Sequence, residues 1–346
     1  MIRNVWNVLW ITVALVGMLG CSNPTEPGNE QGTTESIAGE GTSVADASTS
    51  TGSEATPGPE TAPGPEKPAE PEKVPMPTQK TFGEGKRAVE IQIPFGYDPV
   101  KPLPLLVVLH GYGANGPLQA AYLGFTRLQE TEKFLMLTPN GTTDPTNRNF
   151  WNATDACCNF ASSKVDDVAY IKGLIDEVKS VYRVDETKVF LVGHSNGGFM
   201  SYRMACDASN SITAIASLAG ASFFDKSRCK PSRKVNILQI HGTNDRTILY
   251  NGGTIPVANK KYPSAQQSVD MWKSYNECSG ERKASGTNRD LENGLAGNES
   301  TVQIVEGCPA GGAVELWAIQ QGGHLPNVSQ TFAKQVWDWF NEKTSQ

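Results

Sequence analysis

The feature that most constrains the fold is an apolar strand pattern that runs directly into a glycine-flanked serine and then a helical pattern. Residues 189–198 read VFLVGHSNGG, and the helical pattern begins at Asn196. At such a strand–turn–helix junction the serine takes a strained conformation that projects its hydroxyl outward. Gly193 and Gly197 fit this turn, because larger side chains would strike the adjacent strand and helix. The alternative is a glycine-rich structural turn. The context favours Ser195 as a nucleophile.

The chain beyond Lys80 alternates strand patterns with helical patterns. Strands are expected near residues 87–94, 103–109, 134–138, 188–192, 212–218, 235–240, 301–305 and 314–319. Helices are expected at 166–182, from 196 onward, at 264–275 and at 330–340. Strands that alternate with helices predict a mostly parallel α/β sheet covered on both faces. We find no internal repeat, and we expect one domain at 81–346.

A base for the serine is selected by the scarcity of histidine. The chain has four histidines, His110, His194, His241 and His324. Hydrolases with this turn carry their triad in the order serine, acid, histidine, and only the last two histidines follow Ser195. His241 ends a strand and precedes any suitable acid, so His324, in a glycine-rich loop after the last strand, is the predicted base. His110 and His194 adjoin motif glycines and are expected to position turns.

The acid of the triad is predicted to be Asp245. It closes the segment HGTND at 241–245, after the next-to-last apolar run of the core sheet. A loop there would direct its carboxylate at His324, which it would orient and stabilise as a cation. An Asx-turn role is the structural alternative. Asp225 is a weaker rival, and Asp166 and Asp167 fit a helix cap better.

Two backbone N–H groups are candidates for binding an oxyanion. Asn196 opens a helix directly after the nucleophile, so its N–H points where negative charge would develop. The second donor should follow strand 103–109, where residues 110–113 read HGYG. Glycines there let the backbone approach a substrate oxygen, and Tyr112 N–H is the predicted donor. A plain strand-to-helix loop is the alternative.

Six cysteines follow Cys21, an even number that suggests disulfides in an exported chain. They are Cys157, Cys158, Cys206, Cys229, Cys278 and Cys308. The last two lie at the ends of one segment and are expected to pair. A bond between the first two, which are neighbours, would be strained. Each of these is therefore expected to reach one of the middle two, with the choice open. A zinc site competes weakly, because no C-x-x-C pair is present.

The N-terminal residues 1–20 fit a signal peptide. Arg3 supplies a positive charge, and the apolar stretch to Gly20 is short for a membrane span. The segment MLGC at 18–21 resembles a bacterial lipobox, in which the cysteine is lipidated. We therefore expect Cys21 to carry a lipid, with ordinary secretion and nearby cleavage as the alternative.

Residues 21–80 are expected to form a disordered tether. From residue 22 to 80 there is no aromatic residue and no leucine, while ten acidic residues and three lysines are present. Such a segment buries too little apolar surface to offset the entropy of ordering it. Residues 81–346 carry equal numbers of acidic and basic side chains. The absence of a basic cluster argues against nucleic acid as a partner.

Six motifs together resemble a known family of esterases. In chain order they are HGYG at 110–113, WNATDACC at 151–158, VDDVAYI at 165–171, GHSNGG at 193–198, HGTND at 241–245 and GGH at 322–324. This set is similar to the polyhydroxybutyrate-depolymerase-type esterases, the LpqC-like and feruloyl esterase group of carbohydrate esterase family 1. The resemblance covers about residues 86–340.

The resemblance implies an α/β-hydrolase fold and a serine esterase without metal or organic cofactor. It implies Ser195, Asp245 and His324 as the triad, with Tyr112 and Asn196 as oxyanion donors. The loop that contains Trp151, Cys157 and Cys158 would lie beside the substrate. His194, directly before the nucleophile, is also assigned to substrate binding.

The resemblance also supports a bond between Cys278 and Cys308. One departure concerns the loop of His324, which continues Leu325-Pro326 where the family commonly has Thr-Trp-Pro. A wall of the substrate pocket therefore differs from the family pattern.

The expected substrates are feruloyl or acetyl esters of plant polysaccharide, or polyhydroxyalkanoate. We expect a monomer at the cell surface or outside the cell, attached to a bacterial outer membrane only through its lipid. Two rival functions remain. A peptidase of the prolyl-oligopeptidase type would cleave aminoacyl amides, and a surface binding lipoprotein would carry an inert hydrolase fold.

Overall fold

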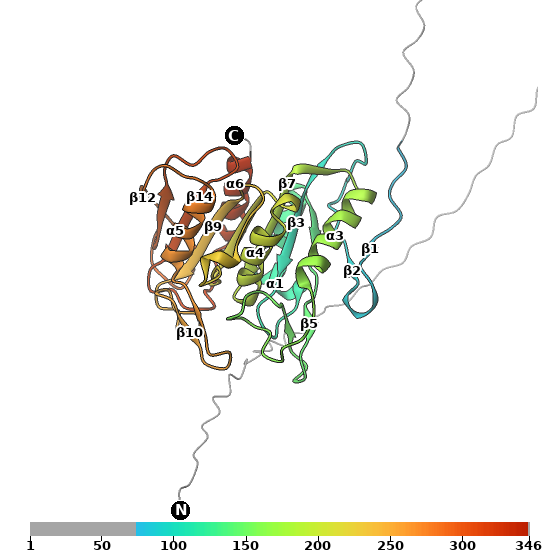
Figure 1. Ribbon diagram of the computed structural model, residues 1–346. Helices are drawn as coiled ribbons and strands as arrows, with labels where there is room; N and C mark the ends of the chain where they lie inside the picture. The colour runs from blue at the N-terminus through green and yellow to red at the C-terminus, as the bar shows by residue number, and fades with distance from the viewer. Residues whose placement is uncertain (1–73, 345–346) are drawn as a thin grey trace, which may run out of the picture. The chain divides into compact units, whose positions relative to one another are not determined.

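An eight-stranded sheet runs through the computed structural model, which describes residues 74–344 (Figure 1). The predicted signal segment, Cys21 and the tether up to residue 73 lie outside the described residues. The strands are β3 (Leu103–Leu109), β4 (Leu135–Leu137), β7 (Val184–His194), β8 (Ala214–Leu218), β9 (Asn236–Gly242), β12 (Arg282–Arg289), β13 (Ser300–Val305) and β14 (Val314–Ile319). Their order is β12-β13-β14-β9-β8-β7-β3-β4. The six strands from β14 to β4 are parallel, and β13 pairs antiparallel with β12 and β14.

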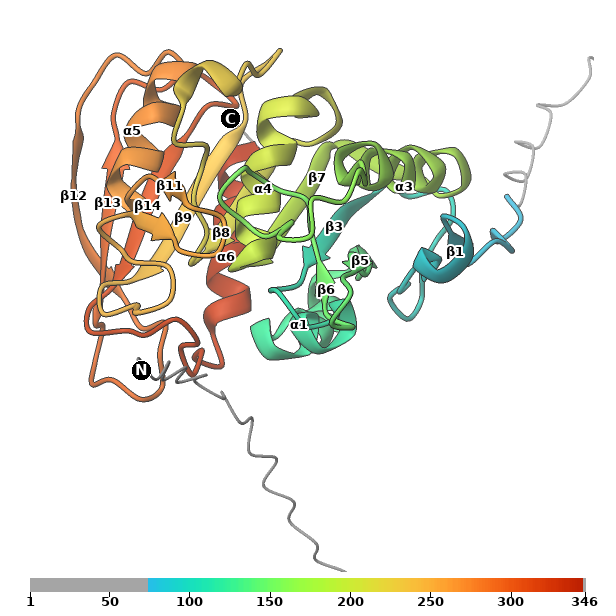
Figure 2. The same ribbon diagram turned by 60° about the horizontal axis from the view of Figure 1, so that its bottom comes forward.

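Helices cover both faces of this sheet, as predicted (Figure 2). One face carries α3 (Asp167–Val181), α4 (Asn196–Asp207) and α5 (Ala265–Tyr275), and the other carries α1 (Gly116–Leu123), α2 (Phe125–Glu132) and α6 (Phe332–Thr344). Successive side chains of a strand point to opposite faces. In β3, Leu105 and Val107 therefore enter one core, while Leu106 and Val108 enter the other. A strand buried on both faces explains the continuous apolar run read from the sequence.

Side-chain caps start three of the helices. Asp166 caps α3 by accepting a hydrogen bond from the Ala169 N–H, which confirms the predicted cap. Ser264 and Gln267 form a capping box at the start of α5. Asn115 caps α1 through the Leu118 N–H, a start that the sequence reading did not identify. Local side-chain chemistry thus determines where these helices begin.

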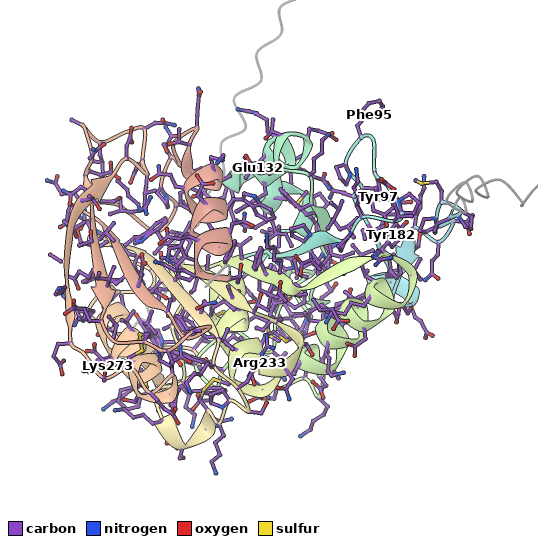
Figure 3. The ribbon with its side chains drawn as sticks, turned by 90° about the horizontal axis from the view of Figure 1, so that it is seen from above. Phe95, Tyr97, Glu132, Tyr182, Arg233 and Lys273 are labelled. Carbon is purple, nitrogen blue, oxygen red and sulfur yellow. A yellow bond between two sulfur atoms is a disulfide. The ribbon has the colours of Figure 1, made fainter. Side chains whose placement is uncertain are left out.

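The strand predicted at residues 87–94 is much shorter in the structure. Only β2 (Val89–Glu90) forms there, and it pairs antiparallel with β1 (Thr81–Phe82). Arg87 belongs instead to the short helix η1 (Gly85–Arg87), and Gln92 makes an isolated bridge to Met136 at the edge of the main sheet. The chain then reaches β3 through a loop in which the Tyr97 ring lies 5.7 Å from the Tyr182 ring (Figure 3).

Strand β12, which lies at one edge of the sheet, is not expected from the sequence. Its sequence RKASGTNR has no alternating apolar pattern, and its side chains are mostly exposed. Pairing with β13 holds it in place. An exposed polar edge strand gives no hydrophobic signal, and its polarity discourages pairing with other chains.

Two short hairpins extend from the loops. The long loop at 139–164 contains β5 (Thr142–Thr143) and β6 (Asn149–Phe150), and a second hairpin is made of β10 (Gly253–Ile255) and β11 (Lys260–Tyr262).

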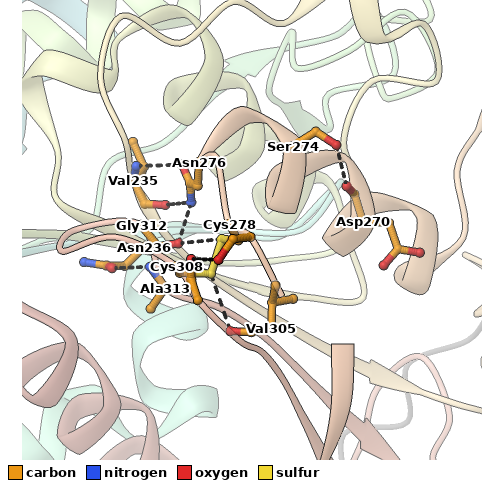
Figure 4. Close-up of a disulfide and its surroundings, with 12 residues drawn as sticks. Val235, Asn236, Asp270, Ser274, Asn276, Cys278, Val305, Cys308, Gly312 and Ala313 are labelled. Carbon is orange, nitrogen blue, oxygen red and sulfur yellow. Dashed lines mark hydrogen bonds between the residues drawn. A yellow bond between two sulfur atoms is a disulfide. The ribbon is translucent and has the colours of Figure 1, made fainter. Parts of the chain in front are cut away.

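Three disulfides connect the six cysteines that follow Cys21, and one pairing expectation is wrong. The structure contains the predicted Cys278–Cys308 bond, which joins the end of α5 to the chain after β13 (Figure 4). The other bonds are Cys206–Cys229 and Cys157–Cys158. The Cα atoms of Cys206 and Cys229 lie 4.9 Å apart, a normal disulfide separation. Because that pair is complete, the two neighbouring cysteines in the loop have only each other.

Within residues 74–344 we find no helix that is both long and apolar enough to cross a membrane.

Candidate active site

Ser195 occupies a sharp turn between β7 and α4. Its backbone has φ 54° and ψ −119°, a region that residues other than glycine rarely adopt. The turn fits only because its neighbours are glycines. A Cβ on Gly197 would lie 2.1 Å from the Leu109 carbonyl oxygen, and one on Gly193 would lie 2.2 Å from the Gly197 carbonyl oxygen. The close approach of Gly197 to the end of β3 and of Gly193 to the start of α4 explains the small residues of the motif.

The structure brings Ser195, His324 and Asp245 together. His324 Nε2 lies 3.0 Å from Ser195 Oγ, and His324 Nδ1 lies 2.7 Å from Asp245 Oδ2. His324 comes from the loop after β14, and Asp245 follows β9, the neighbouring parallel strand. Parallel strands end at the same edge of the sheet, so residues distant in sequence meet there. This is the geometry of a serine activated by an oriented imidazole.

Four groups hold the Asp245 carboxylate. Its Oδ1 accepts hydrogen bonds from the N–H groups of Thr247 (2.8 Å) and Ile248 (2.9 Å). Its Oδ2 faces His324 and also His241, whose Nε2 lies 3.3 Å away. Burial raises the pKa of Asp245, but hydrogen bonds from His241 and His324 lower it more, so the pKa lies well below its usual range. Asp245 is therefore a stable anion behind the imidazole.

The rival acid lies elsewhere. Asp225 caps the short helix η3 (Lys226–Arg228) by accepting a hydrogen bond from the Ser227 N–H. Its carboxylate has a local structural role, and the structure pairs His324 with Asp245 instead.

The two proposed oxyanion donors lie on either side of the serine turn. Asn196 is the first residue of α4, and Tyr112 follows the end of β3. A Cβ on Gly111 would lie 3.5 Å from Ser195 Cβ, so the loop of Tyr112 runs directly beside the serine. Among residues 74–344, neither the Tyr112 N–H nor the Asn196 N–H has an acceptor. Their role as donors to a substrate oxygen stays a prediction.

The Asn196 side chain is bound to the long loop at 139–164. Its Oδ1 accepts a hydrogen bond from the Trp151 N–H (2.7 Å), and its Nδ2 donates to the Trp151 carbonyl (3.0 Å). The Trp151 indole N–H donates to the His110 carbonyl at 3.0 Å. This indole is fully buried. Its observed contacts hold the backbone around the site, and a role in substrate binding stays a prediction.

A partly buried ion pair supports the same loop. Arg87 Nη2 lies 2.7 Å from Asp167 Oδ1, and the other carboxylate oxygen accepts a hydrogen bond from the Asn152 N–H at 2.6 Å. The Arg87 guanidinium lies 3.6 Å from the centre of the Tyr170 ring. Burial raises the pKa of Asp167, while Arg87 opposes the rise. The sequence predicts a helix cap at Asp166 and Asp167 and gives no sign of this ion pair.

Two histidines beside the site are held neutral. His194 Nε2 lies 2.8 Å from the His324 carbonyl oxygen, and burial lowers its pKa to about 3. His110 Nε2 accepts a hydrogen bond from the Gly141 N–H, its Nδ1 faces the Gly111 carbonyl, and burial lowers its pKa to about 4. Both histidines position backbone, as expected. Substrate binding by His194 stays a prediction.

The rim of the site carries partly exposed apolar side chains. The Tyr112 ring packs edge-on against Phe160 with 5.5 Å between ring centres, and the Tyr112 hydroxyl donates to Asp144. Leu325, directly after the base, is 69% exposed. Cys158 lies close by in sequence to Phe160 but is buried, so its predicted contact with substrate stays a prediction.

Among the described residues, no group of three or more histidine, cysteine, aspartate or glutamate side chains is arranged to hold a metal ion.

This chain is similar in sequence to known esterases. The family model described as phospholipase/carboxylesterase matches residues 97–279, which is more than half of the chain. The match includes Ser195 and Asp245 and ends before His324. Feruloyl esterase B of Piromyces equi is 27% identical over 262 residues, which is 74% of this chain. The bifunctional acetylxylan esterase/xylanase XynS20E of Neocallimastix patriciarum is 25% identical over 246 residues, or 70% of this chain.

Both relatives extend beyond the matched region, since this chain spans 45% of the first and 31% of the second. Among solved structures, an acetyl xylan esterase from Aspergillus awamori superposes with a TM-score of 0.54 at 14% identity. The superposition covers 76% of this chain and 97% of that enzyme. At that identity the likeness shows the fold alone. The predicted α/β-hydrolase fold is thereby confirmed.

Proposed function

Because this chain belongs to the phospholipase/carboxylesterase family, we propose that it is a serine hydrolase that cleaves carboxylic esters of plant polysaccharide. The observation that carries the proposal is the position of His324 between the hydroxyl of Ser195 and the carboxylate of Asp245. A serine hydroxyl needs an adjacent base to attack a carbonyl, and this arrangement supplies one.

The proposed mechanism is acyl transfer through Ser195. As Ser195 Oγ attacks the ester carbonyl, His324 Nε2 takes its proton and Asp245 stabilises the imidazolium. The N–H groups of Tyr112 and Asn196 bind the oxyanion of the tetrahedral intermediate. His324 then protonates the leaving alcohol, and an acyl-enzyme remains. Water attacks this ester with His324 as base, and the carboxylic acid is released.

The acyl group is proposed to pack on the rim beside the oxyanion donors. Tyr112 and Phe160 present ring surface there, and Leu325 adds apolar surface next to the base. Aromatic pairs are favourable in edge-to-face arrangements, so this rim suits a feruloyl ring better than an acetyl group. The names of the relatives, a feruloyl esterase and an acetylxylan esterase, cover both possibilities.

The activity is tested with the full chain on methyl ferulate and p-nitrophenyl acetate, beside Ser195→Ala. We expect turnover of at least one ester by the unaltered chain and loss of at least about 10⁴-fold in kcat for the variant. No ester turnover by the unaltered chain, or equal turnover by the variant, would contradict the proposal.

The acyl preference is tested with Phe160→Ala. We expect kcat/KM for methyl ferulate to fall about fivefold to tenfold, the equivalent of one aromatic contact, and that for p-nitrophenyl acetate to change less than twofold. Phe95→Ala is a matched control, since Phe95 is 85% exposed and lies in the segment between β2 and β3. An equal fall for both esters would overturn the proposed ring subsite.

We also propose that the protein acts outside the cytoplasm. Three disulfides in the described part of the chain support this proposal, because disulfides persist in oxidising compartments. Lipid attachment at Cys21 is part of the proposal. Cells grown with a labelled fatty acid should incorporate label into the full chain and not into Cys21→Ala. Equal labelling of both proteins, or of neither, would exclude an anchor at Cys21.

A further inference from the structure

A chain of buried polar side chains continues from Asp245 into the sheet, away from the serine. His241, in β9, is almost fully buried. Its Nε2 lies 2.7 Å from the Ile248 carbonyl oxygen and 3.3 Å from Asp245 Oδ2. The acid of the proposed triad therefore faces two imidazoles, and only His324 reaches the serine.

Gln239 determines which nitrogen of His241 carries the proton. The Gln239 Nε2 donates to the Gly220 carbonyl at 2.9 Å and lies 3.0 Å from His241 Nδ1. Its Oε1 accepts a hydrogen bond from the Tyr202 hydroxyl at 2.8 Å. A backbone carbonyl can only accept, so it fixes the orientation of the amide. The amide N–H then points at Nδ1, which must be an unprotonated acceptor.

The remaining proton of a neutral His241 is thus on Nε2, where it faces the Ile248 carbonyl and the Asp245 carboxylate. A second proton on Nδ1 would meet the Gln239 amide N–H, so the amide opposes the imidazolium form. The side chains of Gln239, His241 and Asp245 are buried, and a buried donor without an acceptor costs folding free energy.

We propose that Gln239 is a positioning residue that keeps His241 as the neutral Nε2–H tautomer and so reserves the charge of Asp245 for His324. This inference rests on the proposed function of the triad. A cationic His241 would lie against the same carboxylate oxygen as His324 and would compete for its charge. It would also repel the imidazolium that His324 forms during the reaction.

Other titratable groups face this cluster and must be considered in any pH profile. They are Asp245, His324, His194, Tyr202, Tyr250 and Tyr262. Burial is the main cause that raises the pKa of each tyrosine and lowers that of His194. His194 and the tyrosines therefore stay neutral across the usual assay range.

The tautomer can be observed directly by nitrogen NMR of the full chain labelled with ¹⁵N-histidine. The chain has four histidines, and His241→Asn assigns the signals of His241 by their loss. We expect the Nε2 signal in the range of a protonated nitrogen and the Nδ1 signal in the range of an unprotonated one at pH 7. A protonated Nδ1, in either the other tautomer or the cation, would overturn the proposal without any reference to activity.

Gln239→Glu tests the consequence for the proposed base. A carboxylate beside Nδ1 favours the imidazolium, and a nearby opposite charge shifts a pKa by about one unit or more. We expect both nitrogens of His241 to be protonated at pH 7 in this variant. The acidic limb of the profile of kcat/KM against pH should move to a pH about one unit lower, and kcat should fall about tenfold. Both effects are expected because a cationic His241 repels the His324 cation.

Tyr202→Phe is the matched control. It removes the hydroxyl that bonds to Gln239 Oε1 and leaves the Gly220 carbonyl, so the tautomer and the acidic limb should stay unchanged. A change of tautomer in Tyr202→Phe, or a Gln239→Glu variant with a neutral His241, would contradict the role of the amide. If the unaltered chain shows no esterase activity, the proposed function fails while the NMR result still decides the tautomer.

Discussion

The two halves of the site are held in place by different means. In the acid–base half, His324 and Asp245 lie on loops that leave the adjacent strands β14 and β9, and buried side chains of β9 support them. In the half that carries the proposed oxyanion donors (the oxyanion half), Asn196 and Tyr112 contact the long loop at 139–164, which is held by hydrogen bonds and by the pair of Arg87 and Asp167.

This difference suggests how each half should respond to substitution. The acid–base half lies on loops that leave adjacent strands of the sheet, so changes there should affect chemistry more than folding. The oxyanion half depends on a long loop that is held by hydrogen bonds and an ion pair, so changes in these supports should reduce stability and activity together.

Asp245→Asn should lower kcat for the best ester by about 10⁴-fold, because the base loses its orienting anion. The Thr247 and Ile248 N–H groups still bind one side-chain oxygen, so the fold should persist. Initial rates and thermal unfolding measure the two effects. Asp225→Asn, at the rival acid, should retain kcat within twofold. A loss as large as that of Asp245→Asn would indicate that Asp225 is the acid of the triad.

Asp167→Asn should lower the free energy of unfolding by about 3–5 kcal/mol, because it leaves the charge of Arg87 without its buried partner. Urea unfolding at pH 7 measures the change. Asp166→Asn is a matched control, since asparagine caps a helix as well as aspartate does and should cost under about 0.5 kcal/mol. Equal stability of the two variants would show that the ion pair contributes nothing.

The protein should lose stability as the pH falls from 7 to 5. Burial lowers the folded pKa of His194 to about 3 and of His110 to about 4, below the unfolded value of about 6.5. The unfolded chain therefore binds more protons in this range, and each histidine should account for about 2 kcal/mol of the loss. Urea unfolding at both pH values measures it. His194→Asn should show a smaller pH dependence, and an unchanged slope would contradict the assignment.

Asn196→Ala should lower kcat about tenfold with little change in KM. The substitution keeps the backbone N–H and removes both hydrogen bonds to Trp151, so the donor loses its support. Asn149→Ala is a matched control on the same loop, where the amide bonds to the Ala114 carbonyl. Steady-state kinetics measure kcat and KM for both variants. Equal kcat for Asn196→Ala and the unaltered chain would show that the contact of Asn196 with the loop does not support catalysis.

The acid–base half could be read from the sequence because its residues stand in local motifs. Strand periodicity and the glycines around Ser195 located the turn, and the scarcity of histidine selected His324. The structure brings these residues together with Asp245 as the chain order suggested.

The supports of the oxyanion half could not be read in this way. The contacts of Asn196 with Trp151 and of Arg87 with Asp167 join positions that are 45 and 80 residues apart, and nothing in local sequence marks them. The pairing of Cys157 with Cys158 was missed for a related reason. It follows from the proximity of Cys206 and Cys229, which only the folded chain reveals.

Catalysis by this site requires that His324 activate Ser195, and covalent labelling tests that activation most directly. A fluorophosphonate reacts with an activated serine, and mass spectrometry of the digested full chain locates the adduct. We predict a single adduct on the peptide that contains Ser195, formed at least about 10³-fold more slowly in His324→Ala. An adduct on another residue, or an equal labelling rate in the two proteins, would contradict the activation of Ser195 by His324.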